Sequence, residues 1–505
     1  MQEISVHASR AGGDERLGAL LSSRLGFAGL LAIVAVYYLF LLSNGTFRLF
    51  APEMLDRTYD SMLVHLLHGE FTVDRRAIDW ESFTRNGKTY TYFGVFPALL
   101  RLVAMPFTDV AQVEFARLSC LTALVIFVAL QLRMLLFVHN TLPAKNRVPG
   151  FLAVMTAATL LSGPQLYILG SATIYHESLL WSAAMGAAFN LIVLRAALGE
   201  GDLGARDQAA LAALAGLALN TRPTIGVALS LGTVLLVVRT VWRRHLSGPP
   251  SAVAGRGPLM AAAAMASDPC VLLPFLVLGL FVVACGIVNF ERWGNPLSFA
   301  DFRDYDFYRR HPDLAAVLRN TGDFDLGRIW IGALYYATGI PYVLKAVPPF
   351  EQFLAARYTG IEAPPFTPLL TNPLTIFLAG IGLWRLCRKP ALPAGGLAIL
   401  RLALIGNVAA VLLIFSAAAL EMRYRFDLTP FMTLAAFVGY RFASIAAVES
   451  SEAWRRRTRV AAVGLCVFGI LMSHYVLLIH KVWSLGEPME VRRTLAVFAP
   501  FAFKP

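Results

Sequence analysis

The feature that most constrains this chain is a series of long apolar runs separated by polar connections. A bilayer core of about 30 Å requires about 20 apolar residues in a helix, and most of the runs approach this length. Charged residues make up only 15% of the 505 residues, whereas soluble domains carry about 25%. The sequence therefore predicts an all-α polytopic membrane protein with about eleven transmembrane helices. These spans are expected at residues 25–43, 113–138, 149–170, 177–198, 207–221, 224–241, 270–290, 373–387, 396–419, 427–444 and 459–480.

The connecting segments predict the orientation of the chain. With the N-terminus in the cytoplasm, the loops on that side are short and basic, as the positive-inside rule requires. The opposite side then receives two long outer loops, 44–112 and 291–372, together with the C-terminus. A stretch at 242–269, rich in small residues, Pro and Gly, is expected to be a cytoplasmic linker. Residues 1–505 are therefore interpreted as one integral-membrane domain, whose first apolar run is retained and not cleaved as a signal.

Charge and cysteine content exclude several classes of function. The formal net charge is +12, but in a membrane protein excess Lys and Arg records which loops stay in the cytoplasm, so nucleic-acid binding is not expected. The five cysteines lie in or beside apolar runs without a CxxC spacing. Neither a disulfide framework nor a zinc site is therefore expected.

A cluster of carboxylates follows the first apolar run, in the stretch PEMLDRTYDSMLVHLLHGEFTVD. Its apolar spacing predicts an amphipathic helix over 53–69, lying in the membrane interface and ended by Gly69. On such a helix Glu53, Asp56 and Asp60 share one stripe. The stripe has two interpretations: a solvated polar face, or a general base at membrane depth. Repulsion among the carboxylates would raise at least one pKa, which suits a base that works near neutral pH.

The remainder of the first outer loop contains two further patterns. The string RNGKTY at 85–90 predicts a β-hairpin turn centred on Asn-Gly. The apolar stretch 93–107 is interrupted by glycine and proline, and it predicts a second interfacial helix or a re-entrant segment. His65 and His68 lie off the acidic stripe and are interpreted as interfacial polar residues, not metal ligands.

Several charged residues lie at the outer ends of spans. Arg222, Arg423 and Arg425 are expected to converge outside an otherwise apolar bundle, where each arginine costs free energy unless it is paired or functional. Together they indicate a site for an anionic head group. His176 and Glu177 begin one span, but adjacent helical positions point about 100° apart, so both cannot be ligands on one helix face.

The sequence carries no motif of a soluble nucleotide-dependent or hydrolytic enzyme. It has no Walker A sequence, no HExxH, no GxSxG in a triad order, and no GxGxxG opening a βαβ unit. Any energy for chemistry would have to arrive in an activated, membrane-borne substrate.

The order of these features resembles the GT-C class of integral-membrane glycosyltransferases, and especially bacterial members of the protein mannosyltransferase and aminoarabinose-transferase superfamily. The strings that carry the resemblance are YDSMLVHLLHGEFTVD, GKTYTYFGVFPALLRL, IYHESLLW, GLALNTRPT, NFERWGNPLSF and RYRFDLTPF. The resemblance implies an enzyme of the bacterial inner membrane whose donor is a sugar on a polyprenyl phosphate. It further implies that an outer-loop carboxylate deprotonates an acceptor hydroxyl, which attacks the anomeric carbon with inversion. Most members of the superfamily need no metal for this step, and none is expected here.

The resemblance also implies roles for individual residues. The base is expected at Asp56, with Asp60 and then Glu53 as alternatives, and Arg222, Arg423 and Arg425 are candidates for the donor phosphate. Further candidates for lining the cavity are Lys88, Tyr90, Tyr92, His176 and Glu177. The acceptor remains open among a cell-wall glycan, a lipid-linked saccharide, lipid A and a protein.

Two other functions compete with glycosyl transfer. A transporter or lipid flippase without covalent chemistry would place polar residues near the middle of several spans, whereas the polar residues of this chain concentrate in the outer loops. An accessory protein of envelope assembly that keeps the fold without activity is the third possibility.

Overall fold

Helices dominate the computed structural model, which describes residues 13–148, 150–199, 201–247, 265, 267–362, 367–388 and 392–484. Within these residues, nine helices are long and apolar enough to cross a membrane. The protein is therefore a multi-pass integral membrane protein. The bundle is built from α1 (Gly13–Ser22), α2 (Arg24–Leu42), α6 (Ala116–Asn140), α7 (Phe151–Leu161), α8 (Pro164–Ile168), α9 (Ile174–Leu198), α10 (Ala205–Leu219), α11 (Pro223–Val241), α14 (Pro269–Trp293), α21 (Pro373–Cys387), α22 (Ala394–Ser416), α23 (Thr429–Glu449) and α24 (Glu452–Ser484).

The expected count of eleven full spans is not confirmed, and the difference lies in the two short candidates. Both are helices, α10 and α21, but each has only 15 residues. At 1.5 Å per residue such a helix covers roughly 22 Å, less than a bilayer core of about 30 Å. Another expected span, 149–170, is divided into α7 and α8 at Gly163, whose φ is 106°.

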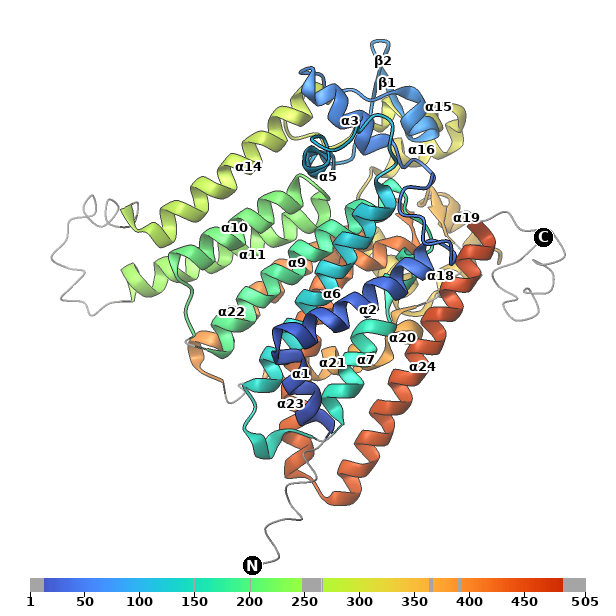
Figure 1. Cartoon of the computed structure of the whole chain (residues 1–505). Helices are drawn as coiled ribbons and strands as arrows, with labels where there is room; N and C mark the ends of the chain where they lie inside the picture. The colour runs from blue at the N-terminus through green and yellow to red at the C-terminus, as the bar shows by residue number, and fades with distance from the viewer. Residues whose placement is uncertain are drawn as a thin grey trace, which may run out of the picture.

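The helices pack as neighbours that are not always consecutive in sequence. The closest packing joins α6 with α9, α10 with α14, α11 with α22, and α21 with α23 (Figure 1). Small residues allow two of these pairs to approach closely. A Cβ at Gly439 of α23 would overlap the carbonyl oxygen of Leu378 in α21, and one at Gly406 of α22 would overlap the backbone of Gly232 in α11. The five cysteines are free thiols.

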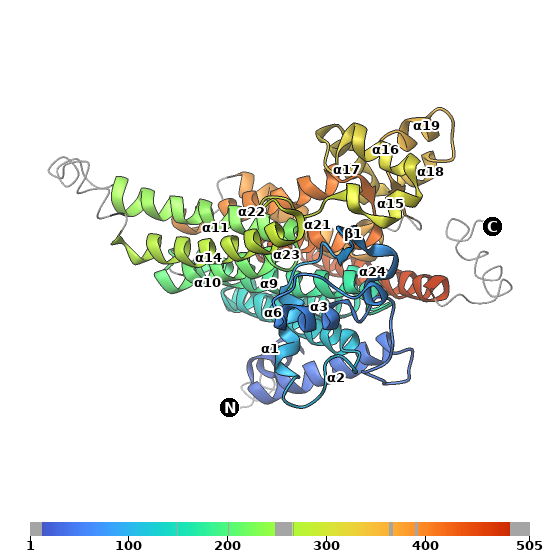
Figure 2. The same cartoon turned by 90° about the horizontal axis from the view of Figure 1, so that it is seen from above.

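The two long loops lie together at one end of the bundle, called here the loop end (Figure 1). Figure 2 views the molecule from above and shows α15 to α19 grouped beside β1. The first loop contains α3 (Thr58–Leu67), α4 (Arg75–Ile78), η2 (Asp79–Glu81), β1 (Phe83–Arg85), β2 (Lys88–Tyr90), α5 (Phe96–Leu99) and η3 (Leu100–Val103). The second contains η6 (Phe302–Asp304), α15 (Asp306–Arg310), α16 (Pro312–Thr321), η7 (Leu326–Arg328), α17 (Ile329–Thr338), α18 (Ile340–Leu344), α19 (Phe350–Ala355), β3 (Gly360–Ile361) and α20 (Pro368–Thr371).

Each long loop contributes to a small two-stranded sheet. The predicted hairpin is present as antiparallel β1 and β2, and Asn86 and Gly87 at its turn have φ values of 50° and 76°, which are the left-handed conformations that favour Asn and Gly. In the second sheet, β3 pairs in parallel with β4 (Ala419–Leu420). This strand is followed by η8 (Met422–Leu428), a turn of 3-10 helix that leads into α23.

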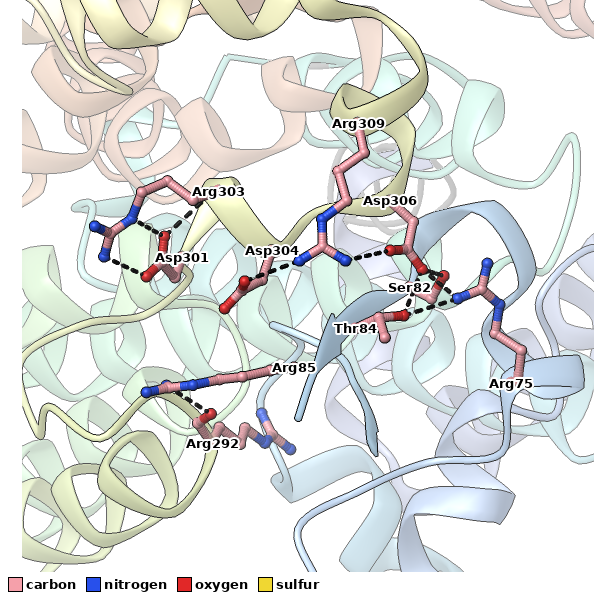
Figure 3. A network of polar contacts seen from close by, with 10 residues as sticks. All are labelled: Arg75, Ser82, Thr84, Arg85, Arg292, Asp301, Arg303, Asp304, Asp306 and Arg309. Atoms are coloured by element: carbon pink, nitrogen blue, oxygen red, sulfur yellow. Dashed lines mark hydrogen bonds and ion pairs between the residues drawn. The ribbon is translucent and has the colours of Figure 1, made fainter. Parts of the chain in front are cut away.

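Asp306 is the main polar link between the first and second loops (Figure 3). Its Oδ2 accepts hydrogen bonds from the hydroxyls of Ser82 at 2.8 Å and Thr84 at 2.7 Å, and it forms an ion pair with Arg75. Arg309 donates to the other carboxylate oxygen at 3.3 Å. These donors outweigh the effect of burial and hold the pKa of Asp306 below its usual range. The second loop is thereby fixed over the hairpin of the first.

Most of the expected linker 242–269 lies outside the described residues. Its first part forms the π-helix η5 (Trp242–Leu246), which extends α11. Asp268 at the other end caps α14, because its carboxylate accepts a hydrogen bond from the backbone N–H of Cys270 at 2.9 Å.

The close approach of α21 and α23 gives a first prediction. Gly439→Ala is expected to lower the thermal stability of the protein, because the new Cβ forces the two helix backbones apart at a cost of about 1–3 kcal/mol. The control is Gly464→Ala in α24, where a Cβ meets no atom within 4 Å and alanine favours the helix. Thermal unfolding in detergent measures both variants. Equal stability of the two variants would contradict close packing at Gly439.

Candidate active site

The acidic stretch of the first loop differs from its sequence prediction. The helix α3 begins at Thr58, not at residue 53, because Leu55 has a φ of 60° and interrupts the helical path. Glu53 and Asp56 therefore precede the helix, and only Asp60 lies on it. The predicted stripe of three carboxylates on one helical face is wrong, and each carboxylate has a different set of partners.

Glu53 and Asp56 make local contacts beside the start of α6. Glu53 forms an ion pair with Arg117 at 2.6 Å. One oxygen of Asp56 accepts a hydrogen bond from the backbone N–H of Glu53 at 2.6 Å. Burial raises the pKa of Asp56, and the nearby carboxylate of Glu114 adds to this shift. Asp56 is thus a carboxyl group that titrates above its usual range.

Asp60 belongs to a buried ion cluster that links the first loop to the bundle. The Nε of Arg101, in η3, donates to Asp60 at 2.9 Å. The same guanidinium forms an ion pair with Glu177 of α9, with 2.8 Å between Nη2 and Oε2. Ser119 also donates to Glu177, at 2.6 Å. Arg101, Asp60 and Glu177 are each at most 3% exposed. Glu177, which the sequence analysis named only as a candidate for lining the cavity, holds this cluster together with Arg101.

The cluster leaves part of Asp60 without a partner. Its Oδ2 is buried and accepts no hydrogen bond among the described residues. Burial raises the pKa of Asp60 to about 6, and the attraction of Arg101 opposes that shift. Asp60 is therefore close to the point of titration at neutral pH, although it lies in a closed environment.

Arg222 is already neutralised within the protein. Its guanidinium binds the Asp427 carboxylate in a two-point fork, with 2.5 Å between Nε and Oδ1. The ring of Tyr424 lies 5.2 Å from the same guanidinium. Arg222, at the start of α11, thus connects that helix to η8.

Arg423 is also paired, and it lies at the centre of a wider cluster. It forms an ion pair with Glu421 and lies 4.0 Å from the centre of the Tyr175 ring. Glu362 lies close enough to Arg423 to interact electrostatically, and it accepts a hydrogen bond from the backbone N–H of Met422 at 2.6 Å. Burial raises the pKa of Glu362.

Glu81, at the end of η2, joins this cluster from the first loop. Hydroxyls of Tyr175 and Tyr305 hydrogen bond to its carboxylate, and Arg423 and Glu421 interact with it electrostatically. Burial raises its pKa, and the two tyrosines oppose the shift. We call Glu81, Tyr175, Glu362, Glu421 and Arg423 the loop-end cluster. It brings both long loops, α9 and the segment before α23 to one place.

Arg425 differs from the other two arginines because it lacks an anionic partner. It is 4% exposed, and its Nε and Nη2 have no hydrogen-bond partner among the described residues. It lies within electrostatic range of Glu362 and 6.0 Å from the Tyr335 ring. A buried guanidinium with free donors is costly unless an anion binds to it.

A cavity opens beside Arg425 between α6, α7, α21 and α23. Its polar lining includes Gln131, Ser162, Gln165, Asn372, Thr429 and Thr433. Its apolar lining includes Met155, Ala158, Ile376, Leu428, Met432 and Phe437. The cavity therefore combines one unpaired cation with walls that suit a hydrocarbon chain.

The other predicted residues occupy varied positions. Lys88 is exposed at the hairpin, and the Tyr90 ring lies 6.1 Å from Trp293. Tyr92 stacks on Phe93 at 4.4 Å and lies within electrostatic range of Glu81 and Arg423.

The histidines of the sequence prediction make local contacts. The Nδ1 of His176 donates to the carbonyl of Ser171 at 2.6 Å. His65 contacts the Thr72 hydroxyl at 2.7 Å, and His68 contacts the carbonyl of Val64 at 2.8 Å. The described residues contain no group of three His, Cys, Asp or Glu side chains able to hold a metal ion.

Sequence reasoning missed Arg101 and Glu81. The signal for Arg101 was present, because it is a lone arginine within the apolar stretch 93–107, where a cation requires a partner. No comparable signal marks Glu81, which lies in an ordinary polar segment and acquires its environment from residues far away in the sequence.

The structure is similar to solved structures of two membrane proteins. One is ArnT from Cupriavidus metallidurans bound to undecaprenyl phosphate, with 13% identity, a TM-score of 0.44, and coverage of 95% of this chain and 80% of that chain. The apo oligosaccharyltransferase of Archaeoglobus fulgidus matches with 14% identity, a TM-score of 0.42, and coverage of 90% and 56%. AglB from the same organism, in complex with an inhibitory peptide and a dolichol-phosphate, matches with 14% identity and a TM-score of 0.41. This match covers 90% of this chain and 55% of that chain.

The chain spans little more than half the length of the archaeal proteins. No family model and no curated protein matches the chain. Because the identities and TM-scores are low, a function for this chain has to come from its own residues.

The ion cluster around Arg101 gives a second prediction. Arg101→Gln is expected to destabilise the protein by about 3–5 kcal/mol, because it leaves two buried carboxylates without their cation. Arg76→Gln is the control, since Arg76 is exposed on the same loop and its loss should cost at most about 0.5 kcal/mol. Chemical or thermal unfolding measures both. A loss for Arg101→Gln as small as that of the control would contradict a role of the cluster in holding the loop.

The titration of Asp60 gives a third prediction. Its pKa rises from an ordinary value of 3.8 to about 6 in the folded protein, so between these values the folded state binds more protons than the unfolded state. The contribution of Asp60 to the free energy of unfolding therefore falls as the pH rises from 3.8 to about 6. Asp60→Asn should remove this fall. The free energy of unfolding of both proteins is measured across this pH range. Identical slopes of this free energy against pH would refute the raised pKa of Asp60.

Proposed function

We propose that the protein is a glycosyltransferase that moves a sugar from a polyprenyl-phosphate donor to an acceptor hydroxyl, with inversion at the anomeric carbon. The observation that carries this proposal is Arg425, a buried guanidinium with free donors beside a cavity that has apolar walls. A lipid phosphate fits this place, since its anion satisfies the guanidinium and the part of its chain next to the phosphate lies against the apolar walls of the cavity. The likeness in fold to the GT-C class agrees with this assignment.

The three arginines of the sequence hypothesis have separate roles in this proposal. Arg425 binds the phosphate, because its donors are free. Arg222 and Arg423 are engaged with Asp427 and Glu421, so they position η8 and set the potential around it. As the donor bond breaks, negative charge develops on the phosphate oxygen, and a preorganised guanidinium stabilises that charge.

The general base of this proposal is Glu81. Glu81 lies in the loop-end cluster and interacts electrostatically with Arg423. Arg423 precedes the proposed phosphate-binding residue, Arg425, by two positions in the sequence. Burial raises the pKa of Glu81, which brings it nearer to the range in which a base is effective at neutral pH. Asp56, the base expected from the sequence, also has a raised pKa and is the alternative. Asp60 and Glu53 are held by Arg101 and Arg117.

The reaction balances without a further reactant. The acceptor oxygen forms a bond to the anomeric carbon while its proton moves to the Glu81 carboxylate. The bond between that carbon and the phosphate oxygen breaks, and its electron pair stays on the phosphate. Polyprenyl phosphate leaves, and the protonated carboxyl group later returns its proton to water. The activated donor supplies the free energy, which agrees with the absence of nucleotide-binding motifs in the sequence.

The proposed location is the inner membrane of a bacterium. Short basic loops favour a cytoplasmic N-terminus, which puts the loop end and the C-terminus on the periplasmic side. The donor sugar and the acceptor, a glycan, lipid or protein, would meet there. Neither nucleic acid nor a metal has a part in the proposal.

A transporter or flippase is the second candidate, and the loop-end cluster argues against it. Its three carboxylates and Arg423 gather at one end of the bundle. Transport would favour a site near the bilayer midplane that is open alternately to each side. Flux of a lipid-linked sugar across liposomes without formation of a transfer product would favour transport over the enzyme.

The phosphate site gives a fourth prediction. Arg425→Gln should weaken binding of undecaprenyl phosphate and lower sugar transfer by about 10²–10³-fold, because one preorganised cation is lost from the leaving group. The measurements are binding of undecaprenyl phosphate in detergent and transfer from a panel of polyprenyl-phosphate sugars. Arg76→Gln, with its exposed side chain, is the control. Unchanged binding in folded Arg425→Gln protein would refute the site.

The base gives a fifth prediction. Glu81→Gln should lower transfer by roughly 10²–10⁴-fold while undecaprenyl phosphate still binds, because the substitution removes proton transfer and keeps the size of the side chain. The rate of the unmodified protein should rise with pH as Glu81 loses its proton, at a pH above the ordinary carboxyl range. Glu70→Gln, at an exposed carboxylate of the same loop, is the control. Full activity of Glu81→Gln together with an inactive Asp56→Asn would assign the base to Asp56.

A further inference from the structure

We propose that a groove at the opposite end of the bundle binds an anionic phospholipid, with the acyl chains in the groove and the phosphate at its arginines. This end, called here the basic end, is where α21 and α23 finish and α24 begins, at the bottom of Figure 1. The inference does not depend on the proposed enzymatic activity, because the groove and the loop-end cluster lie at different ends of the same helices.

The groove is formed by α21, α23 and α24. Its apolar walls include Leu374, Phe377 and Trp384 of α21, Phe442 and Ala446 of α23, and Leu465 of α24. The groove runs alongside α21, which contributes residues from Leu374 to Arg385 to its lining, while α23 and α24 supply the facing walls.

The length of the groove matches one leaflet of a membrane. From Leu374 to Arg385 it follows α21 for 11 helical steps of 1.5 Å each, or roughly 16 Å. Half of a bilayer core of about 30 Å is about 15 Å. An acyl chain that enters at the basic end would therefore lie along the groove over the depth of its own leaflet.

Arginines give the groove a cationic mouth. Arg385 and Arg457 belong to the lining, and Arg388 lies 4.6 Å from the Trp384 ring. Arg385 lies 4.9 Å from the same ring and 5.9 Å from that of Phe442. Among the described residues, none of these three arginines forms an ion pair with a carboxylate.

This combination identifies the occupant by its chemistry. Apolar walls of leaflet depth require hydrocarbon chains, and unpaired guanidinium groups at the mouth require an anion. Trp384 and Trp454 both line the groove, and tryptophan is enriched at the level of lipid head groups. A phospholipid with net negative charge, such as phosphatidylglycerol, suits the apolar walls, the unpaired guanidinium groups and the tryptophans. A zwitterionic lipid suits the apolar walls and the tryptophans, but it has no net negative charge for the guanidinium groups.

Native mass spectrometry of the full chain tests the proposal. The protein in detergent is titrated with phosphatidylglycerol and, separately, with phosphatidylcholine of the same acyl chains. Phosphatidylglycerol should bind more tightly, and Arg385→Gln and Arg457→Gln should each weaken its binding about fivefold. Arg456→Gln is the matched control, because Arg456 is the exposed neighbour of Arg457 and does not line the groove.

A second variant tests the acyl part of the site. Ala461→Trp fills the groove from an exposed position on α24, and it should weaken binding of both lipids. The proposal is overturned if the two lipids bind equally well to the unmodified protein. It is also overturned if Arg456→Gln costs as much as Arg457→Gln, if Ala461→Trp leaves binding unchanged, or if glycerol phosphate alone displaces the lipid. Should Arg385→Gln fail to fold, the exposed Arg457 carries the charge test.

Discussion

A guanidinium group buried in an apolar bundle needs anions or other acceptors for its N–H groups, and this requirement organises the loop end of the protein. Arg101 is held by Asp60 and Glu177, Arg222 by Asp427, and Arg423 by Glu421. Each pair joins segments that are separate in the fold or stabilises a turn between them. Breaking the pairs of Arg101 costs several kcal/mol because the charges that remain stay buried. Arg425 forms no such pair among the described residues, and its Nε and Nη2 have no hydrogen-bond partner there, which is why we propose that it binds the phosphate of a ligand.

The paired arginines also explain how the loops are positioned. Arg101 draws η3 and α3 of the first loop against α9, and Asp306 holds the second loop over the hairpin of the first. As a result, Glu81 on the first loop meets Tyr305 from the second loop, and both lie beside Tyr175 of α9. The candidate base is therefore oriented by contacts from three parts of the chain. Because the residues that surround Glu81 come from distant parts of the chain, the sequence next to Glu81 carries no signal of this role.

The sequence was sufficient for the features that depend on local composition. The apolar runs predicted the helices of the bundle, the short runs at 207–221 and 373–387 became the short helices α10 and α21, and Asn86-Gly87 predicted the hairpin turn. It failed at residues 53–57, where helical spacing predicted a continuous helix. A single backbone conformation with positive φ at Leu55 ended that helix, and periodicity carries no information about such a conformation.

The candidate site shows the same division. The sequence selected arginines near the outer ends of spans, and two of them, Arg222 and Arg423, lie 5.2 Å and 5.7 Å from the centre of the Tyr424 ring. The sequence did not reveal which of these arginines has an anionic partner. Asp427 is far from Arg222 in the sequence, and the pairing of Glu421 with Arg423 depends on the local turn of the backbone. Glu362, which lies near both Arg423 and Arg425, comes from the end of the second long loop. Contacts between residues that are distant in the sequence determine which charged side chains are paired, and a single sequence does not reveal these contacts.

A density map of the protein with bound undecaprenyl phosphate tests the central claim most directly. The account predicts that the phosphate lies within hydrogen-bond distance of the Arg425 guanidinium, with the first part of the lipid chain at the cavity between α6, α7, α21 and α23. A phosphate bound elsewhere, with Arg425 left unoccupied or paired to a carboxylate of the protein, would contradict it.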